Sequence, residues 1–216
     1  IAVLCSSCEH VEEPAFNDLK TMTQILMGTL PEPEITRSQV SKLPYATMRA
    51  KIARGPRGIL ALARYDSNDL HWISRDSALF VTRRGRVIRT GGLVENLLGT
   101  DVGDNDPVQT GLHRLTGPAS FTRWIDTDFE NRYQMKVMSK FELVRREQIT
   151  ILDRTYDTIY GRELNYVPDI GWKFTNHYWV DEKSGFVWKS RQYIAHSFGP
   201  LELEVLKPAA PLPTAT

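Results

Sequence analysis

Cysteine is almost absent from this chain of 216 residues. The only two cysteines, Cys5 and Cys8, lie close together near the start of the sequence. Such a spacing could belong to a redox pair or to half of a zinc site, but no second cysteine pair and no flanking helix or strand pattern supports either. The cysteine-free remainder suits an exported protein that does not depend on disulfides.

The sequence also lacks a long apolar run and an excess of one charge. No internal segment approaches the roughly 20 apolar residues that span a membrane. Lys and Arg number 27 and Asp and Glu number 26, so composition gives no reason to expect nucleic acid as a partner. Arginines and lysines are concentrated between Arg49 and Arg89, where we expect them on a solvated face of strands.

Motifs for common catalytic chemistries are missing as well. There is no glycine-rich phosphate loop and no nucleophile elbow, and the five histidines show no close pairing of the kind that binds metals. Asp126 and Asp128 share one strand face and Glu142 follows, so a polysaccharide hydrolase or lyase remains an alternative. Neighbours on one strand face are about 7 Å apart by geometry alone, so this spacing is uninformative. We predict no enzyme, no cofactor and no metal site.

The chain does contain an aromatic-rich stretch at residues 171–194. Two aromatic runs flank residues 181–185, whose composition is typical of a β-hairpin loop. Pairing Val180 with Phe186 predicts a buried face with three polar members, Asn176, Ser190 and Gln192, which must bond to one another or line a cavity. The apolar members of that face are Trp172, Phe174, Tyr178, Val180, Phe186, Trp188 and Ile194.

The opposite face of the hairpin is mostly wettable and is our candidate binding surface for a glycan or a partner. It carries His177, Trp179, Arg191 and Tyr193, with Val187 beside Trp179. An exposed Trp179 or Tyr193 could stack on a sugar ring. His177 and Arg191 could hydrogen-bond hydroxyls or pair with an acidic sugar. The alternative is that these residues form ordinary cross-strand pairs on a solvated sheet face.

Runs in which apolar and polar residues alternate, separated by turn residues, predict strands over most of the chain. Short runs follow one another from residue 45 to residue 90, longer ones occupy 119–129, 133–143 and 156–166, and residues 201–206 close the series. Tight turns join antiparallel neighbours, and long twisted strands curl. We therefore predict a mainly β fold, a curved antiparallel meander sheet or an incomplete β-barrel. A few short α-helices should accompany it, at residues 16–27, 36–43 and 91–99.

The same features divide the chain into four segments. Residues 1–7 are predicted to be the end of a signal peptide, 8–34 a lipid-anchored tether with a helix, 35–207 the antiparallel β domain, and 208–216 a flexible proline-rich tail. Residues 4–8 are similar to a bacterial lipobox, in which Ser7 precedes the cleaved bond and Cys8 carries the lipid. Cys5 stands where such a motif usually has leucine.

Several stretches, taken in order, resemble one protein family. They are LPYATMR at residues 43–49, LHWIS at 70–74, GRVIRTGGL at 85–93, NHYWVD at 176–181, GFVWKSRQ at 185–192 and LKP at 206–208. Their order and spacing are similar to those of the YjbF/GfcB family of outer-membrane lipoproteins, from about Pro44 to Pro208. The resemblance implies a lipoprotein held at the outer membrane through Cys8, facing the periplasm, and encoded with machinery that makes or exports capsule or exopolysaccharide. The family is not known as catalytic, so it supplies no active-site residues.

We therefore predict a non-catalytic accessory factor in capsule or exopolysaccharide production or export. Its partners would be the outer membrane, through the N-terminal lipid, and a polysaccharide or another export-machinery protein. One alternative is a half-barrel carrier of lipid or lipoprotein, which requires a continuous apolar cavity. The polar residues on the inner hairpin face argue mildly against that carrier.

Overall fold

Strands dominate the computed structural model, which describes residues 35–197 and 199–210. They form one twelve-stranded sheet in which every paired neighbour is antiparallel, so the predicted mainly β fold with few short helices is confirmed. In chain order the strands are β1 (Thr47–Ile52), β2 (Arg57–Asp66), β3 (Asp69–Ile73), β4 (Leu79–Arg83), β5 (Arg86–Gly91), β6 (Leu97–Asp101), β7 (Ala119–Thr127), β8 (Arg132–Ile151), β9 (Arg154–Val167), β10 (Trp172–Asp181), β11 (Val187–Gln192) and β12 (Leu201–Lys207).

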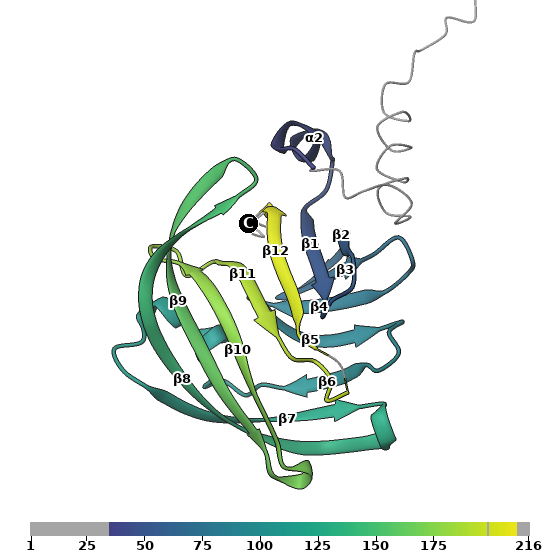
Figure 1. The fold of residues 1–216 in the computed structure, drawn as a ribbon, viewed down its shortest axis with the longest axis vertical. Coiled ribbons are helices and arrows are strands. Elements are labelled where there is room, and N and C mark those ends of the chain that lie inside the picture. The colour runs from purple at the N-terminus through teal and green to yellow at the C-terminus, as the bar shows by residue number, and fades with distance from the viewer. Residues whose placement is uncertain (1–34, 198, 211–216) are drawn as a thin grey trace, which may run out of the picture. The chain divides into compact units, whose positions relative to one another are not determined.

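The sheet curls into a nearly closed barrel whose seam lies in the middle of the sequence. The last strand, β12, pairs with both β11 and β1, so the two ends of the strand series meet. The edges of the sheet are β5 and β6. At this seam the backbone N–H of Leu97 donates to the Thr90 side chain at 3.0 Å. Figure 1 shows β8, β9 and β10 on one side of the barrel and β2 to β6 on the other.

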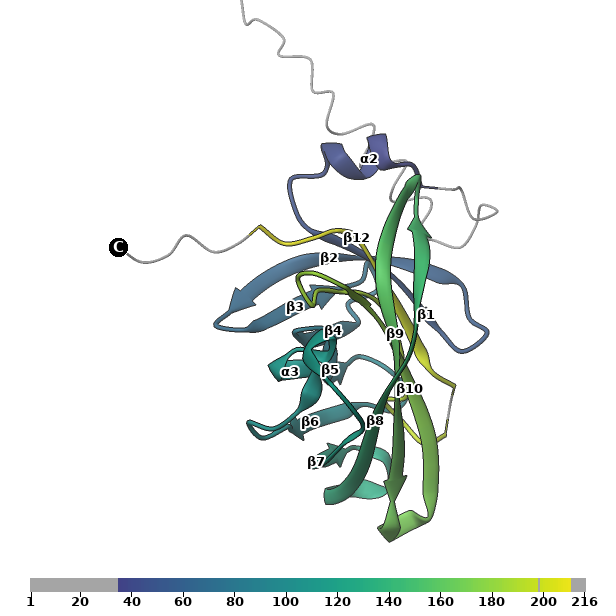
Figure 2. The same ribbon diagram turned by 90° about the vertical axis from the view of Figure 1, so that its left-hand side faces the viewer.

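Helix α2 (Arg37–Lys42) covers the end of the barrel where β1 begins and β12 ends (Figure 2). Thr36 and Gln39 form a capping box that satisfies its first N–H groups. Arg37 donates to the backbone oxygen of Ile151 at 2.9 Å, and Lys207 donates to that of Ser41 at 3.2 Å. The helix predicted at residues 36–43 is therefore present.

A second predicted helix, at residues 91–99, is wrong. These residues make a bend and then enter β6. Gly92 has a φ of +75°, outside the helical region, and Asn96 holds the bend by accepting from the Leu93 N–H at 3.0 Å. The helix predicted at residues 16–27 lies outside the described residues. None of the helices within the described ranges is long and apolar enough to cross a membrane.

The aspartate-rich loop after β6 leads into two short helices that pack against the inner face of the barrel. They are α3 (Pro107–Thr110) and the 3-10 helix η1 (Leu112–Arg114). Asp106 caps α3 by accepting from the Val108 N–H at 3.0 Å. One apolar cluster joins these helices to β7, β8, β10 and β11; its buried members are Val108, Leu112, Phe121, Phe141, Tyr178, Val180 and Val187.

A larger apolar cluster occupies another part of the barrel interior. Trp72 is 1% exposed and its indole N–H donates to the Thr82 hydroxyl at 2.9 Å, so the largest side chain of the cluster is both packed and hydrogen-bonded. Other members come from strands on all sides of the barrel and include Met48, Leu60, Phe80, Val87, Val137, Val167, Phe174, Ile194, Leu201, Leu203 and Val205.

The predicted hairpin is formed by β10 and β11, but its pairing differs from the prediction by two residues. Tyr178 pairs with Ser190 rather than with Trp188. A shift of two residues preserves the alternation of faces, so Asn176, Ser190 and Gln192 are buried as expected.

A register irregularity near Val180 reverses one part of the hairpin prediction. Trp179 pairs with Lys189 but Val180 pairs with Val187, so Trp188 is an extra residue in β11. Consequently Val187 is buried at 8% exposure, whereas Phe186 is 36% exposed. The prediction had placed Phe186 inside and Val187 outside, because a sequence alternation alone does not reveal a bulge.

Candidate functional site

The surface predicted on β10 continues onto the outer faces of the neighbouring strands. His177 pairs with Arg162 of β9 and Arg191 of β11. Trp179 pairs with Tyr160 of β9 and Lys189 of β11. Since directly opposed residues of antiparallel strands share a face, these side chains form two adjacent rows. We call this set the outer patch: Tyr160, Arg162, His177, Trp179, Lys189 and Arg191.

Aromatic rings occupy the middle of the outer patch. The ring centroid of Tyr160 lies 5.3 Å from that of Trp179 and 5.9 Å from that of His177. The Tyr160 hydroxyl is 2.7 Å from His177 Nδ1. Partial burial, followed by the charges of Arg191 and Arg162, lowers the pKa of His177. The imidazole is therefore neutral at neutral pH, so its Nδ1 can accept the tyrosine proton and its Nε2–H remains a donor.

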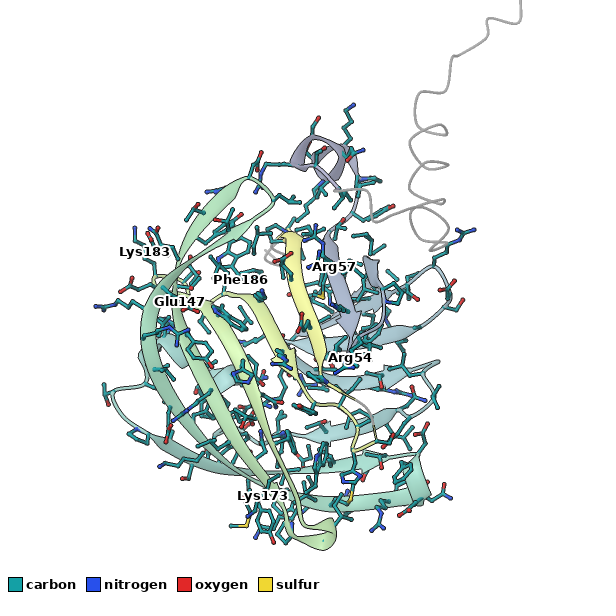
Figure 3. All side chains as sticks on the ribbon, viewed as in Figure 1. Arg54, Arg57, Glu147, Lys173, Lys183 and Phe186 are labelled. Atoms are coloured by element: carbon teal, nitrogen blue, oxygen red, sulfur yellow. The ribbon has the colours of Figure 1, made fainter. Side chains whose placement is uncertain are left out.

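Cations lie over the rings of the outer patch. Lys189 Nζ is 5.2 Å from the Trp179 ring centroid, and the guanidinium carbon of Arg145 is 4.5 Å from that of Tyr160. Glu147 of β8 lies on this side of the barrel (Figure 3), accepts from the Trp179 indole N–H and pairs with Arg145 at 2.6 Å. The result is an aromatic surface with cations at its faces, a combination that suits an anionic ligand with an apolar ring face.

The two arginines of the outer patch differ in the strength of the ion pairs that they form with neighbouring carboxylates. Arg162 pairs with Glu142 at 2.8 Å. Arg191 is 3.7 Å from Glu202, and both side chains are more than 40% exposed, at 44% and 43%. An exposed pair of this length contributes little to stability, so the Arg191 guanidinium is available to a ligand at small cost.

Tyr193 lies apart from the other predicted site residues. Strand β11 ends at Gln192, and the Tyr193 backbone N–H donates to the Asn176 side chain at 2.8 Å. Its ring packs 5.7 Å from Phe174 and 6.4 Å from Trp172, within the large apolar cluster. The structure thus brings His177, Trp179 and Arg191 together but places Tyr193 elsewhere, because the strand alternation stops one residue before it.

The barrel interior contains a charged cluster that sequence reasoning missed. Arg86 and Asp106 form two parallel hydrogen bonds, Nε to Oδ2 at 2.5 Å and Nη2 to Oδ1 at 2.8 Å. Arg123 donates to Glu163 at 2.6 Å, and Arg86 donates to the same carboxylate at 3.2 Å. Tyr178 adds a donor to Glu163 at 3.1 Å. All of these side chains are at most 4% exposed.

The electrostatics of the cluster are those of a permanently ionised structure. Burial opposes the ionisation of Glu163, but the charges of Arg123 and Arg86 outweigh it and lower its pKa to about 2. Burial raises the pKa of Tyr178 well above its usual value, so this hydroxyl stays protonated and can donate. With its charges paired and its carboxylates fully hydrogen-bonded, the cluster stabilises one arrangement of the barrel rather than performing proton chemistry.

The three predicted inner polar residues belong to or border this cluster. Asn176 donates to Glu163 at 2.8 Å, and Gln192 donates to the Ser190 hydroxyl at 2.9 Å. Gln192 also accepts from the Val87 N–H at 3.1 Å. These residues do not bond to one another across the hairpin, as one alternative required, but to neighbouring strands and to their own strand. Asn176 and Gln192 also line a small cavity of about 20 Å³, which agrees in part with the other alternative.

The carboxylates considered for glycoside cleavage are each engaged by the protein. Asp126 accepts from the Gln134 N–H at 2.7 Å, and Asp128 accepts from the Asn96 N–H at 2.6 Å. Glu142 pairs with Arg162 and Lys140. Within the described ranges there is no group of three or more His, Cys, Asp or Glu side chains that could hold a metal ion. The predicted lipid attachment residue, Cys8, lies outside those ranges.

Comparison with known families decides the relationship that the sequence motifs suggested. The family described as group 4 capsule polysaccharide lipoprotein gfcB, YjbF matches residues 19–206. The chain belongs to this family. The resemblance predicted from the ordered motifs is therefore confirmed.

Relatives in the YjbF family extend over nearly the whole chain. The uncharacterized lipoprotein GfcB of Escherichia coli K12 is 30% identical over 178 residues, which is 81% of this chain and 82% of GfcB. The uncharacterized lipoprotein YjbF of the same strain is 25% identical over 213 residues, 97% of this chain and 95% of YjbF. The crystal structure of the hypothetical lipoprotein YmcC of E. coli K12 superposes with a TM-score of 0.76 at 26% identity, covering 96% of this chain and all of that one. The barrel is thus a YmcC-like fold.

Proposed function

We propose that this chain is a non-catalytic accessory lipoprotein of capsule polysaccharide production or export, anchored through Cys8 to the periplasmic side of the outer membrane. We further propose that its outer patch binds acidic polysaccharide. Membership of a family of capsule polysaccharide lipoproteins supports the process. The observation that carries the binding role is the set of cation-flanked aromatic rings on one face of β9, β10 and β11.

The chemistry of the outer patch fits an acidic sugar polymer. The apolar faces of sugar rings stack on tryptophan and tyrosine, and uronic acid carboxylates pair with guanidinium and ammonium groups. Lys189 lies over the Trp179 ring, and a flexible lysine can swing aside to pair with a sugar carboxylate while the ring accepts the sugar. The outer faces of β9, β10 and β11 together form an extended surface, which suits a polymer better than a small molecule.

The proposal that the protein is not an enzyme is supported by the state of its carboxylates. Asp126, Asp128 and Glu142 are held by backbone or ion-pair partners on the outside of the barrel. The fully buried Glu163 is locked between two arginines. Glycoside cleavage requires an acid with a raised pKa beside an ionised carboxylate, whereas cationic neighbours lower the pKa of both Glu142 and Glu163.

Titration calorimetry of the full chain with a uronic acid oligosaccharide and a neutral one of equal length tests the binding role. We expect the acidic ligand to bind at least about tenfold more tightly and to weaken with added salt. Trp179→Ala and Arg191→Gln should each weaken binding by about tenfold. Trp124→Ala is the matched control, since Trp124 is 39% exposed on β7, outside the outer patch. Equal binding of both oligosaccharides, or no effect of the patch variants, would refute the role.

The anchoring part of the proposal has its own test. Full-length protein and Cys8→Ser should be expressed in a Gram-negative host and compared by membrane fractionation and intact mass. We expect the wild type to carry the mass of a lipid and to sediment with outer membranes, while Cys8→Ser stays unmodified. Identical behaviour of the two proteins would contradict anchoring at Cys8 without bearing on the outer patch.

A further inference from the structure

A cavity of about 590 Å³ lies inside the barrel at the end where β1 begins and β12 ends. Apolar side chains from opposite sides of the barrel form most of its wall, and Figure 3 shows one of them, Phe186, beside β11 at this end. The volume falls within the range of roughly 300 to 1,000 Å³ that is typical of ligand pockets. The apolar lining residues include Met48, Leu70, Trp72, Val108, Phe186, Val187, Trp188, Val205 and Ala209.

The polar part of the cavity wall has one sign of charge. Arg84 and Arg114 line it together with His113, whereas no Asp or Glu is among the described lining residues. Arg84 donates one hydrogen bond, to the Gln109 backbone oxygen at 2.9 Å, and neither arginine forms an ion pair with another described residue. Both arginines are exposed, so their guanidinium groups lie at the solvent side of the cavity and have no carboxylate partner among the described residues.

His113 forms part of the cavity wall beside Arg114. Its Nδ1 is buried and has no hydrogen-bond partner among the described residues. The ring lies directly against Gly185 of the β10–β11 turn, where even a Cβ atom would collide with it. The Nδ1 atom is therefore covered by Gly185 rather than open to a ligand, and the ring acts as a wall of the cavity.

From these observations we infer that the cavity binds a single-chain anionic amphiphile, an acyl chain that carries a carboxylate or a phosphate. The apolar wall would take the chain, and Arg84 and Arg114 would take the head group. The polar residues that seemed to oppose a lipid site, Asn176, Ser190 and Gln192, do not line this cavity. This site is separate from the outer patch and does not depend on the function proposed for it.

Fluorescence titration of the full chain with parinaric acid, a fluorescent fatty acid, tests the apolar half of the inference. We expect saturable binding that Ala209→Trp weakens by at least about tenfold, because the indole would occupy the chamber. Ala209 is only partly buried and follows the last strand, so the change should leave folding intact, which thermal unfolding checks. Ala209→Ser is the matched control and should bind as the wild type does. Wild-type affinity in Ala209→Trp would overturn the site.

The charged half is tested by competition against bound parinaric acid. A lysophosphatidic acid and a fatty acid should both displace it, and whichever is stronger identifies the preferred head group. An alcohol of the same chain length should compete at least about tenfold less well. The double variant Arg84→Gln with Arg114→Gln should remove this difference, while Arg132→Gln with Arg154→Gln, outside the cavity, should not. Equal competition by the alcohol and the acid in the wild type would overturn the assignment of an anionic ligand.

Discussion

At the scale of single residues, Glu163 has the most demanding position in the molecule. It is 0% exposed and lies between Arg86 and Arg123, at 3.2 Å and 2.6 Å. Two cations and two carboxylates are balanced there, the fourth charge being Asp106. Removing one member of such a set leaves an uncompensated charge in the interior, whereas the intact set need contribute little net stability.

Glu163→Gln should therefore destabilise the barrel by about 3 to 5 kcal/mol. The amide keeps the shape of the side chain but leaves Arg123 without its carboxylate partner. Urea denaturation followed by tryptophan fluorescence measures the loss. Glu142→Gln is the control, because it changes a partly exposed carboxylate of the same kind and should alter stability far less. Similar losses in the two variants would show that the buried charges are not coupled.

The loss of stability in acid should reflect the protonation of Glu163. The folded-state pKa of Glu163 is lowered from 4.5 to about 2. In this interval the unfolded chain binds more protons than the folded one, so the stabilisation is complete above about pH 5 and is lost as the pH falls toward 2. The loss is about 3 kcal/mol. Stability curves of wild type and Glu163→Gln should converge across this interval, and parallel curves would contradict the lowered pKa.

The sequence contained a usable signal for half of this cluster. Arg123 alternates with the inward residues Phe121 and Ile125, and Glu163 lies two residues from buried Asn165 on β9. Strict alternation therefore places both charges inside. Arg86 could not be found in this way. Two adjacent apolar residues, Val87 and Ile88, follow it, so the segment shows no alternation that would place Arg86 on the inner face.

At the scale of elements, two turns depend on glycine for close approach. Gly85, between β4 and β5, has a φ of +93°, and a Cβ atom there would lie 2.5 Å from the Val187 Cβ. Gly185, between β10 and β11, lies directly against His113. Only a residue without a side chain allows these turns to lie against the barrel interior.

Gly85→Ala should lower stability by more than about 1 kcal/mol, through both backbone strain and the collision with Val187. Gly171→Ala is the matched control, since Gly171 also has a positive φ, +64°, but has no atom within 4 Å of an added Cβ. Thermal unfolding of both variants separates strain from collision. Val187→Ala should recover part of the loss in Gly85→Ala, and an equal loss in both glycine variants would contradict the collision.

The two strands at the seam of the barrel, β5 and β6, should be less protected than the strands opposite them. Strands β5 and β6 each have one unpaired edge, whereas β9 and β10 are paired on both sides. Hydrogen exchange followed by mass spectrometry should therefore find faster exchange in residues 86–91 and 97–101 than in residues 160–167 and 172–180. Uniform protection around the barrel would indicate that the seam is closed in solution.

The elements also show where sequence reasoning worked. Alternation and turn residues predicted nearly every strand, because most strands have one buried and one solvated face. The helix predicted at residues 91–99 is wrong. The bend found there depends on a hydrogen bond from the Asn96 side chain, which a hydrophobic pattern does not reveal. The hairpin faces were predicted correctly except at its ends, where Phe186 and Val187 are reversed by the bulge at Trp188, and the register differs from the prediction by two residues.

At the scale of the whole molecule, the barrel separates two chemistries. Its outer surface carries the aromatic and cationic outer patch, and its interior end holds an apolar cavity with two arginines. Three of the four residues that the sequence predicted for the binding surface belong to the six-residue outer patch, because these three lie on one regular strand pair. The cavity could not be predicted, since its wall combines several separate segments of the chain that only the closed barrel brings together.

The most direct test of the central claim is restoration of capsule in a deletion strain of the bacterium that encodes this chain. The deletion strain should be complemented with wild type, with Trp179→Ala combined with Arg191→Gln, and with Asp126→Asn combined with Asp128→Asn. We predict that the wild type and the aspartate variant restore cell-surface acidic polysaccharide and that the outer patch variant does not, at equal protein levels on immunoblots. Full restoration by the outer patch variant, or failure of the folded aspartate variant, would contradict a non-catalytic role through the outer patch.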